Sequence, residues 1–566
     1  MTAPLITCRS AAPEAIACLV HAGCDPLLAR IYAARGVAAP EELDDAFDRL
    51  HGLDEMLNLR EMARLLADAI SARARLLIVA DYDADGATAC AVGIRALRAF
   101  GAEAAYLVPN RFEFGYGLTP ELARLAHERY RPDVLITVDN GIASIDGVME
   151  ANRLGMRVLI TDHHLPGDSL PAAWCIVNPN QPECPFPSKH LAGVGVMFYL
   201  MLALRAELRS RGALEREAPM SGLLDLVALG TVADVVRLDA NNRVLVQQGL
   251  KRIRAGRMQP GIAALFEAAG RDPRRASAYD LGFVLGPRLN AAGRLSDMAL
   301  GIECLVTNDV ERASSIAQAL HALNRERREI EAQMQESALA ALRDDPGDAF
   351  TLSLFDREWH QGVIGIIASR LKERFHRPAI AFARGQDGEI KGSGRSISAL
   401  HLRDALDLVT RRYPGLVLKF GGHAAAAGLS LRECDFELFK AAFEETVRAL
   451  LTKADLNREI ETDGSLDVQE LTFRSARAVA GAVWGQGFPE PQFFDAFEVL
   501  DQRTVGGQHL KVRLGRAGRV YDGMLFGAAE PLTRHIDAVY RIDVNEFNGT
   551  LGLQLTLQHW RHRAPA

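Results

Sequence analysis

Short runs of mainly aliphatic residues most constrain what this chain can fold into. They occur at 76–80, 104–108, 134–138 and 157–161, and helix-like stretches separate them. Apolar runs of this length are typical of strands that are buried on both faces of a sheet. Strands that alternate with helices indicate βαβ units. We therefore expect an α/β fold built on a parallel sheet.

The pattern changes four times along the chain. Residues 311–343 contain no Gly or Pro and predict one long helix that joins two bodies, although periodicity alone fits a surface helix of one domain equally well. After residue 457 the segments are short and alternating, which indicates a small antiparallel barrel or sandwich. We expect an N-terminal helical cap, the parallel-sheet domain, the connecting helix, a second α/β domain and the β-barrel domain, with the bounds 1–70, 71–305, 306–345, 346–455 and 456–566.

Composition excludes several classes of protein. The 566 residues are 48% hydrophobic and 24% charged, which excludes a disordered or collagen-like chain. No apolar run approaches the roughly 18 residues of a membrane span, and the first 20 residues are not typical of a signal peptide. The eight cysteines form no CxxC pair, so we expect free thiols and a cytoplasmic protein. There is also no GxxxxGK[ST] loop, which argues against a P-loop ATPase.

Acidic residues and histidines follow the predicted strands where each strand ends. Because the carboxyl ends of parallel strands meet at one edge of a sheet, these side chains should lie together. The helix-like run 223–233 ends in the same way. The residues concerned are Asp81, Asp83 and Asp85 in DYDADG, Asp139 in DNG, Asp162, His163 and His164 in TDHH, and Asp234.

So many carboxylates at one site would repel each other unless cations neutralise them. Carboxylate and imidazole ligands without thiolate suit Mn²⁺, with Mg²⁺ as the alternative. The number of groups fits two divalent metal ions roughly 3.5–4 Å apart. Such a pair would generate hydroxide near neutral pH and stabilise negative charge on a phosphoryl oxygen.

Simpler interpretations exist for each motif alone. DYDADG resembles the start of an EF-hand loop, but Val92 stands where the twelfth-position Glu is expected, and a strand precedes the motif. DYDADG could otherwise be a solvated turn, and TDHH a capped turn. Their occurrence together with DNG and Asp234, each at the end of a strand or helix, favours a metal site.

Other motifs favour an anionic ligand. GGHAAAAG (421–428) and GSGRS (392–396) read as Gly-rich turns, which are more often structural than functional. Residues 251–294 hold nine Lys or Arg against three Asp or Glu in a chain whose net charge is −7. A polyanion would bind at such local patches, although a solvated helix face is equally compatible. PNRFEFGYG (109–117) interleaves aromatic residues with arginine, as a single-strand stacking platform requires, although core aromatics are equally compatible. The basic segment 503–519 in the β-rich region suits an OB-like fold.

These motifs resemble a known family. DYDADGATA, VDNG, TDHH and GTVAD resemble the four signature motifs of the DHH phosphoesterase superfamily, and GGHAAAAG resembles the motif of its associated DHHA1 domain. PNRFEFGYGL, GPRLNAAGR, WHQGVIG and WGQGFPEP are similar to segments of its RecJ family, the bacterial 5′→3′ exonucleases specific for single-stranded DNA. The resemblance extends from about residue 50 to the end.

The resemblance implies a role for each matching residue. Asp83, Asp85, Asp139, His163 and Asp234 would hold the metals, with Asp139 as the bridge, while Asp81 and His164 would be ligands or lie directly behind them. Arg111 and Tyr116 would contact the DNA strand near its 5′ end. The DNA phosphates would be bound by Arg288 or Arg294, Ser393, Arg395 and His423, together with Gly421 and Gly422. The implied architecture is a DHH domain, a long helix, a DHHA1-type domain and an OB-like nucleic-acid-binding domain.

The function implied is a two-metal exonuclease that degrades single-stranded DNA to mononucleotides in repair and recombination. We expect a monomer, and the family is associated with single-strand-binding protein and a RecQ-type helicase. One alternative is a small-substrate phosphodiesterase, which needs only the two α/β domains. Another is a non-catalytic single-strand-binding scaffold, in which metal ligands would be lost, whereas all are present here.

Overall fold

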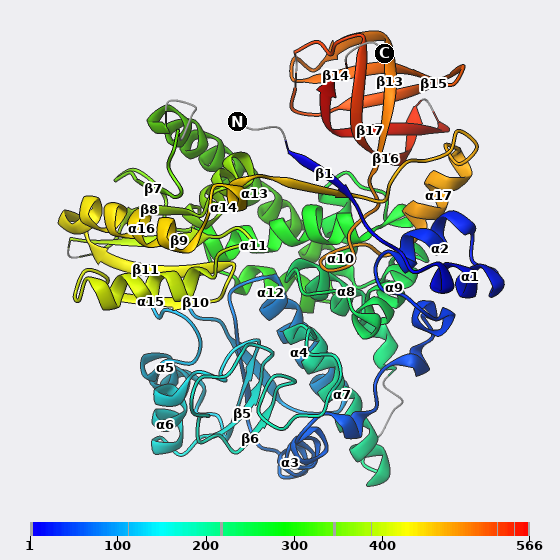
Figure 1. Ribbon diagram of the computed structural model, residues 1–566. Coiled ribbons are helices and arrows are strands. Elements are labelled where there is room, and N and C mark those ends of the chain that lie inside the picture. Colours follow the sequence, from blue (N-terminus) through cyan, green and yellow to red (C-terminus); the bar gives the residue numbers. More distant parts are fainter. Residues whose placement is uncertain are drawn as a thin grey trace. The chain divides into compact units, whose positions relative to one another are not determined.

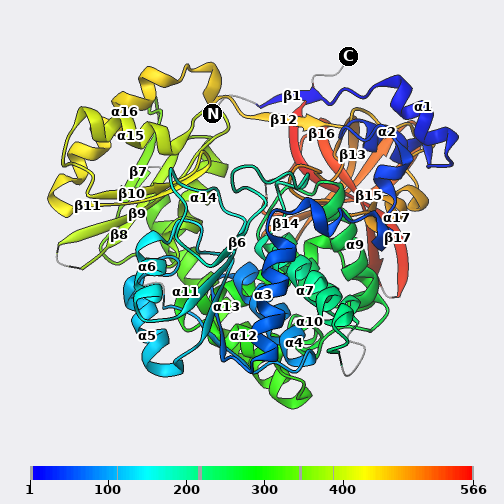
Figure 2. The same cartoon turned by 90° about the horizontal axis from the view of Figure 1, so that it is seen from below.

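The computed structural model describes residues 4–110, 113–214, 219–342, 347–386, 388–528, 530–547 and 549–563. The chain divides into two compact units (Figures 1 and 2). The larger unit comprises residues 8–321 and 462–566, and the smaller unit comprises residues 1–7 and 322–461. Helix α13 (Val310–Leu342) begins in the larger unit and ends in the smaller one, which confirms the predicted long helix.

The larger unit is built on the predicted parallel sheet, whose strand order is β3-β2-β4-β5-β6. Every residue of the two central strands is buried, as expected for strands covered on both faces. Their register pairs Leu76 with Val134 and Ala80 with Val138, so both strands end at the same edge. The strands are β2 (Leu76–Ala80), β3 (Ala104–Leu107), β4 (Val134–Val138), β5 (Arg157–Thr161) and β6 (Cys175–Val177).

Helices cover both faces of this sheet (Figure 1). Helices α5 (Pro120–Tyr130) and α6 (Ile145–Arg153) pack on one face, where Leu122 and Val148 join Leu77 and Val158 of the strands in one apolar cluster. The opposite face is covered by α3 (Leu59–Ser71), α4 (Ala84–Ala99) and α7 (Gly193–Ser210). The result is a three-layer α/β sandwich, which confirms the predicted fold class.

A helical layer follows the sandwich. It contains α8 (Leu224–Ala233), α9 (Ala240–Arg254), α10 (Pro260–Ala268), a π-helical turn (Asp280–Leu285), α11 (Gly286–Leu295) and α12 (Ala299–Val306). Helix α8 packs against α4, α7 and α9. The packing brings the end of α8 to the same edge as the ends of β2 and β4.

The N-terminal segment is less uniformly helical than the predicted cap. It contains α1 (Pro13–His21), α2 (Pro26–Ala33) and three 3₁₀ turns at Pro40–Leu43, Phe47–Arg49 and Leu53–Glu55. Before them, β1 (Leu5–Cys8) forms a two-stranded sheet with the distant β12 (Glu459–Thr462). A lone strand of four residues has no local pattern that reveals its partner.

The C-terminal segment forms a closed barrel in the order β13-β14-β15-β17-β16, as the predicted OB-like domain requires. One pair, β15 with β17, is parallel, whereas the sequence pattern predicts only antiparallel pairs. The elements are α17 (Phe473–Gly481), β13 (Phe493–Val505), β14 (His509–Arg516), β15 (Arg519–Leu525), β16 (His535–Phe547) and β17 (Thr550–His562).

The segment that leads into the barrel packs on the N-terminal helices within the larger unit. Arg35 of the α2 region donates to both carboxylate oxygens of Asp463 at 2.7 and 3.0 Å, and both side chains are almost fully buried. Tyr32 stacks on Trp484 with ring centroids 5.7 Å apart. The N-terminal and C-terminal segments are therefore parts of one compact unit.

The smaller unit holds the second α/β domain. Its mixed sheet has the order β10-β11-β9-β8-β7, and Phe382, Leu406, Phe439 and Phe443 lie in its core. The strands and helices are β7 (Leu352–Phe355), α14 (Ile364–Phe375), β8 (Ala379–Arg384), β9 (Glu389–Arg395), α15 (Leu402–Arg412), β10 (Lys419–Gly422), β11 (Ala426–Arg432) and α16 (Phe436–Leu450).

The interpretation of GSGRS as a turn is wrong, because Gly392–Arg395 lies inside strand β9. A Cβ atom on Gly392 would lie 2.4 Å from the ring of Phe382, so this glycine is required by packing. GGHAAAAG is a turn only at residues 423–425, since its two ends belong to β10 and β11. The glycines of both motifs suggest turns, but they lie in strands. Gly392 of GSGRS is required by close packing, whereas Gly421 and Gly428 of GGHAAAAG leave the strand surface open.

No helix within the described residues is long and apolar enough to cross a membrane.

Candidate metal centre

The loop after β2 places three carboxylates at the first turn of α4. Asp83 is the N-cap of this helix, and its Oδ1 accepts from the backbone N–H groups of Asp85 and Gly86 at 2.9 and 3.0 Å. Asp81 directly follows the strand, and its Oδ1 accepts from the N–H of Tyr82 at 2.8 Å. These local bonds fix the DYDADG loop in a single conformation.

Asp85 is held from the other side by α7. Its two carboxylate oxygens accept from the backbone N–H groups of Gly193 and Val194 at 2.6 and 2.8 Å, at the positive end of that helix. Burial and the neighbouring charge of Asp83 outweigh these bonds and raise the pKa of Asp85 to about 7. A buried carboxylate of this kind needs a cation nearby to stay ionised.

Asp139 directly follows β4 and has a strained backbone conformation. Its φ is +61°, a left-handed value that non-glycine residues adopt rarely and mostly at functional sites. A Cβ atom on Gly193 would lie 2.7 Å from the Oδ1 atom of Asp139, so only glycine lets the carboxylate approach α7 this closely. Burial, followed by the charge of Asp85, raises the pKa of Asp139 well above its usual value.

The imidazole of His163 lies in the middle of these carboxylates. Its Nε2 is 3.0 Å from Asp139 Oδ1, 3.5 Å from Asp234 Oδ2 and 3.9 Å from Asp85 Oδ2. Burial, assisted by the charge of His164, lowers the pKa of His163 to about 4, so the ring is neutral. The ring hydrogen-bonds the backbone of Leu191, and Nε2 has no hydrogen-bond partner among the described residues. Nδ1 therefore carries the proton, and the Nε2 lone pair faces the carboxylates.

Three overlapping groups of side chains at this edge have ligand atoms within 4.8 Å of one another. They are Asp81, Asp83 and Asp139; Asp85, His163 and Asp234; and Asp139, His163 and His164. Asp139 and His163 each occur in two of them, and of the two only the carboxylate has a pair of oxygens suited to bridging two ions. Asp139 Oδ1 and His163 Nε2 are buried and both lack a hydrogen-bond partner in the described structure. An unpaired carboxylate oxygen facing an imidazole lone pair fits a bound divalent cation.

His164 differs from its neighbour because Asp162 pairs with it. Asp162 Oδ1 lies 2.7 Å from His164 Nδ1, and Asp162 also accepts from the backbone N–H groups of Ile142, His163 and His164. Burial opposes protonation of His164, but the hydrogen bond and charge of Asp162 outweigh it and raise its pKa to about 9. Near neutral pH the ring of His163 is therefore neutral, whereas that of His164 is positively charged.

Tyr116 is the other predicted DNA-contacting residue at this edge. Its hydroxyl lies 3.2 Å from both ring nitrogens of His164 and 3.5 Å from the carbonyl oxygen of Asp139. Arg111, predicted beside it, lies outside the described residues. The structure thus brings Tyr116 into the same site as the predicted metal ligands.

Two residues position the groups of this centre. Asp162, which was predicted with the other acidic residues and histidines of this edge, orients His164. Sequence reasoning missed the second, Asn290. Asn290 in GPRLNAAGR accepts from the backbone N–H of Ala84 at 2.8 Å, and so fixes the first turn of α4. Its neighbours in that motif, two arginines, carried the prediction because arginine binds phosphate, and nothing in the local sequence marks the asparagine.

The two arginines of GPRLNAAGR differ in exposure. Arg288 is buried at 6% exposure, and it donates to the carbonyl oxygen of Val284 at 2.6 Å and lies 3.2 Å from His321 Nδ1. Arg294, near the end of α11, is half-buried. Of the two, Arg294 is therefore the more accessible to a phosphate.

The predicted phosphate-binding residues of the smaller unit come together in its sheet. The register pairs Ser393 with Gly428 and Gly428 with Gly421, and it pairs Arg395 with Ala426 next to the His423 turn. Arg395 donates to the Ser393 hydroxyl at 3.2 Å, and both side chains reach Gly365 in the first turn of α14. Cβ atoms on Gly421 or Gly428 would meet almost nothing within 4 Å, so the surface over these strands is open.

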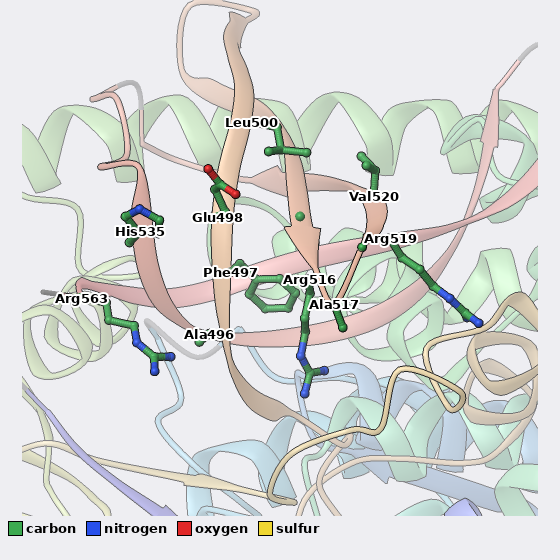
Figure 3. Close-up of a pocket in the computed structure, with 12 residues that line it drawn as sticks. Ala496, Phe497, Glu498, Leu500, Arg516, Ala517, Arg519, Val520, His535 and Arg563 are labelled. Atoms are coloured by element: carbon green, nitrogen blue, oxygen red, sulfur yellow. The ribbon is translucent and has the colours of Figure 1, made fainter. Parts of the chain in front are cut away.

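The barrel carries a hollow of about 550 Å³ (Figure 3). Phe497 and Leu500 line it together with the side chains of Arg516, Arg519 and Arg563. Two of these arginines also bond the backbone of residues 466–468, which precede the barrel strands. Arg516 donates to Leu466 O at 2.7 Å, and Arg519 donates to Val468 O at 3.1 Å. The basic segment of the barrel therefore also holds this preceding segment in place.

Comparison with family models divides the chain into three matched regions. The N-terminal domain of the DHH family matches residues 75–231, the DHHA1 domain matches residues 347–449, and the RecJ OB domain matches residues 462–559. The first region contains seven of the eight carboxylate and imidazole residues considered above, and Asp234 lies just after it.

Comparison with individual proteins extends over nearly the whole length. The single-stranded-DNA-specific exonuclease RecJ of Dickeya dadantii is 51% identical over 551 residues, which cover 94% of this chain and 95% of that protein. Two crystal structures of RecJ from Thermus thermophilus align with 99% of this chain. The complex with Mn²⁺ has a TM-score of 0.83 at 30% identity over 80% of that chain. The complex with Mg²⁺ has a TM-score of 0.76 at 28% identity over 79% of that chain.

Proposed function

This chain belongs to the RecJ family of single-stranded-DNA-specific exonucleases, and from that premise we propose that it hydrolyses single-stranded DNA from the 5′ end and releases mononucleotides. The proposed role is in DNA repair and recombination. The single observation that carries this function is the convergence of Asp85, Asp139, His163 and Asp234 on one buried point, where two facing ligand atoms have no hydrogen-bond partner among the described residues.

Divalent metal ions would be held by the side chains at the sheet edge. We assign one position to Asp81, Asp83 and Asp139 and a second to Asp85, His163 and Asp234. Asp139 is also close to the second position, because its Oδ1 lies 3.0 Å from His163 Nε2. Mn²⁺ or Mg²⁺ bound there would lower the pKa of a water molecule and stabilise negative charge on the scissile phosphate. Carboxylate and neutral imidazole are suitable ligands for either ion.

Other residues of the edge act on the substrate itself. The pKa of about 9 keeps His164 protonated near neutral pH, and its bond to Asp162 fixes the ring. We assign to this imidazolium a hydrogen bond to a phosphoryl oxygen, where a preorganised charged donor stabilises the transition state. The Tyr116 hydroxyl, in contact with His164, would donate to the phosphate or sugar at the 5′ end.

The smaller unit would bind phosphates of the same strand. Ser393, Arg395 and the first turn of α14 gather a hydroxyl, a guanidinium and helix N-terminal N–H groups, which together favour an anion. The bare strand surface at Gly421 and Gly428 would let the sugar-phosphate backbone approach closely. His423, exposed in the adjacent turn, would supply a further donor.

Two alternative functions fit less well. A phosphodiesterase for oligoribonucleotides or cyclic dinucleotides would not need the barrel that matches the RecJ OB domain. A non-catalytic single-strand-binding scaffold would not need an intact set of ligand side chains at the sheet edge. We also propose that the protein acts as a monomer in the cytoplasm, together with a single-strand-binding protein and a RecQ-type helicase, as the family resemblance implies.

The test uses single strands labelled at either the 5′ or the 3′ end and incubated with Mn²⁺ or Mg²⁺. The proposal predicts immediate release of labelled mononucleotide from the 5′ label, and shortening of the 3′-labelled strand from its far end. Duplex DNA of the same sequence and a reaction with excess chelator should give no product. Preferential cleavage of cyclic dinucleotides, or binding without cleavage in either metal, would favour one of the two alternatives.

A further inference from the structure

Two exposed aromatic rings lie side by side on the larger unit. Tyr279 and Phe283 stack with centroids 5.1 Å apart and ring planes 26° apart. They are 57% and 66% exposed. Among the aromatic pairs in the described part of the chain, this is the only one in which both rings are so exposed. The pair therefore contributes little to the core, and it presents a wide aromatic surface to solvent.

The two rings lie at a π-helical turn, with Tyr279 directly before it and Phe283 within it. Residues 280–285 are π-helical and continue into α11, and Asp280 fixes the start of the turn by accepting from the N–H and hydroxyl of Ser277. The two rings are four residues apart, a spacing that brings side chains together on one face of a helix. Single π-helical turns within α-helices are frequent at functional sites.

The helix that carries the two rings also contacts the metal centre. A Cβ atom on Gly282 or Gly286 would lie about 3 Å from Val232 or Ala233, the last residues before Asp234. Further along, Asn290 bonds the backbone of the DYDADG loop, as described above. The exposed ring pair and the candidate metal ligands are thus joined by one rigid helix within one unit.

The surrounding charge is suited to a nucleic acid backbone. Residues 251–294 carry an excess of six positive charges. Within this segment Arg271 lies 3.9 Å from Asp280 in the π-helical turn and is half-exposed, and Arg254 bonds the carbonyl oxygen of Ala276 just before it. Aromatic rings beside basic side chains are the combination that binds single strands without sequence preference.

We propose that Tyr279 and Phe283 form a base-stacking platform that holds unpaired bases of the DNA strand outside the metal centre. This assignment rests on the proposed function and adds a binding subsite to it. Because every base has a flat face that can stack on an aromatic ring, the platform would bind any sequence. An exonuclease that advances along a strand requires such sequence-independent binding. Duplex DNA, whose bases are already stacked on each other, could not use the platform.

The direct test follows stacking itself. Strands with 2-aminopurine at successive positions are bound to the full-length protein in excess chelator, where no cleavage occurs. The expected result is quenched fluorescence at one or two adjacent positions. This quenching should disappear in the double variant Tyr279→Leu/Phe283→Leu and persist in Tyr279→Phe/Phe283→Tyr, which exchanges the rings. Tyr130→Leu, at an exposed aromatic residue at the end of α5, is the matched control and should behave as wild type.

Binding and cleavage then separate this subsite from the active site. We expect the double leucine variant to bind a long single strand at least about 10-fold more weakly, since each stacked base typically contributes 1–3 kcal/mol. Its cleavage of a dinucleotide with Mn²⁺ and its melting temperature should stay within about twofold and about 1 °C of wild type, because both rings are exposed.

The possible results are distinguishable. Unchanged binding and quenching in the double leucine variant would overturn the platform even if the enzyme cleaves single strands normally. If these rings instead mediate contact between two copies of the chain, the same variant would convert a dimer to a monomer without loss of strand affinity, which would also overturn it. Failure of the wild type to cleave would contradict the proposed exonuclease activity, while the fluorescence result would still decide whether the rings stack on bases.

Discussion

The sheet edge of the larger unit and the strand surface of the smaller unit both carry motifs that stand out in the sequence, but they are built in opposite ways. The first gathers carboxylates whose pKa values are raised and leaves Asp139 Oδ1 and His163 Nε2 without a hydrogen-bond partner in the part of the chain described. The second pairs its strands β10, β11 and β9 in register and leaves open space over Gly421 and Gly428. The first region concentrates buried charge, whereas the second has glycines that leave the strand surface free of side chains.

This difference indicates two kinds of functional surface. A cluster of buried charges is unstable by itself, so a cation must complete it, and a change there should affect chemistry first. A bare strand surface is stable without a ligand, so a change there should affect contact with the substrate or packing, depending on which side of the sheet the glycine faces. Four tests, each described below, probe this contrast.

The largest effect is expected from Asp139→Asn. Loss of the carboxylate shared by two ligand groups should slow cleavage more than about a thousandfold, beyond the 10²–10³ typical of one lost transition-state donor. Asp133→Asn is the matched control, since Asp133 precedes the same strand at the opposite edge and makes an exposed pair with Arg75. The measurements are single-turnover cleavage and bound Mn²⁺. Retention of a tenth of wild-type activity by Asp139→Asn would show that Asp139 is not the shared ligand.

His423→Ala should produce the second largest effect. We expect cleavage to slow by about 10²–10³ because one donor to the phosphate is lost, while metal content and melting temperature stay normal. His401→Ala is a control in the same unit, because His401 caps α15 by accepting from Asp404 and should affect stability only. A lowered melting temperature with near-normal chemistry in His423→Ala would instead mean that this histidine braces its turn.

A pair of glycine variants should separate contact from packing. Gly421→Ala adds a methyl group to open space beside Gly428, so we expect weaker strand binding, by about 10-fold, at an unchanged melting temperature. Gly392→Ala forces a Cβ atom to within 2.4 Å of the Phe382 ring and should destabilise the smaller unit by about 1–3 kcal/mol. For each variant, thermal unfolding measures stability, and titration with a single strand in chelator measures strand binding. Equal loss of stability in the two variants would refute the open surface at Gly421.

Sequence reasoning predicted much of the larger unit because its signals are local. Five-residue apolar runs fix the strands, and the topology rule for parallel sheets then brings Asp85, Asp139 and His163 to one edge without knowledge of distances. The long helix α13 was predictable from the absence of Gly and Pro. The closed barrel followed from short alternating segments, although its one parallel pair did not.

The remaining features depend on contacts between distant residues. Asn290 caps α4 from about 200 positions away, β1 pairs with β12 across most of the chain, and the packing of Arg35 on Asp463 joins the two ends of the larger unit. The same packing means that a cut near residue 457, a natural choice from the sequence, would expose the buried Arg35 guanidinium. Point variants of the barrel are therefore better probes of its role than a truncation.

The smallest expected effect is a pH dependence of stability that exists only without metal. Burial raises the pKa of Asp85 to about 7, and it raises those of Asp139 and Asp234 as well. An acid with a raised pKa binds protons more tightly in the folded state, so stability falls as pH rises through that value. The raised pKa of His164, about 9, acts in the same direction, because stability is lost as the ring deprotonates.

The window for this test is pH 6.5–9. Below about 6.5 the lowered pKa of His163 opposes the carboxylates, whereas above its unfolded value of about 6.5 this ring no longer contributes. We expect the melting temperature of the chelated protein to fall by a few degrees across the window, and the slope to flatten with saturating Mn²⁺, since bound cations replace the protons. Asp139→Asn, which removes one buried charge, should be more stable than wild type at pH 9 in chelator and should gain less from Mn²⁺. The melting temperature of the chelated wild type would otherwise stay constant throughout the window. That result would mean that the sheet edge of the larger unit holds no uncompensated charge, and it would remove the contrast with the strand surface of the smaller unit.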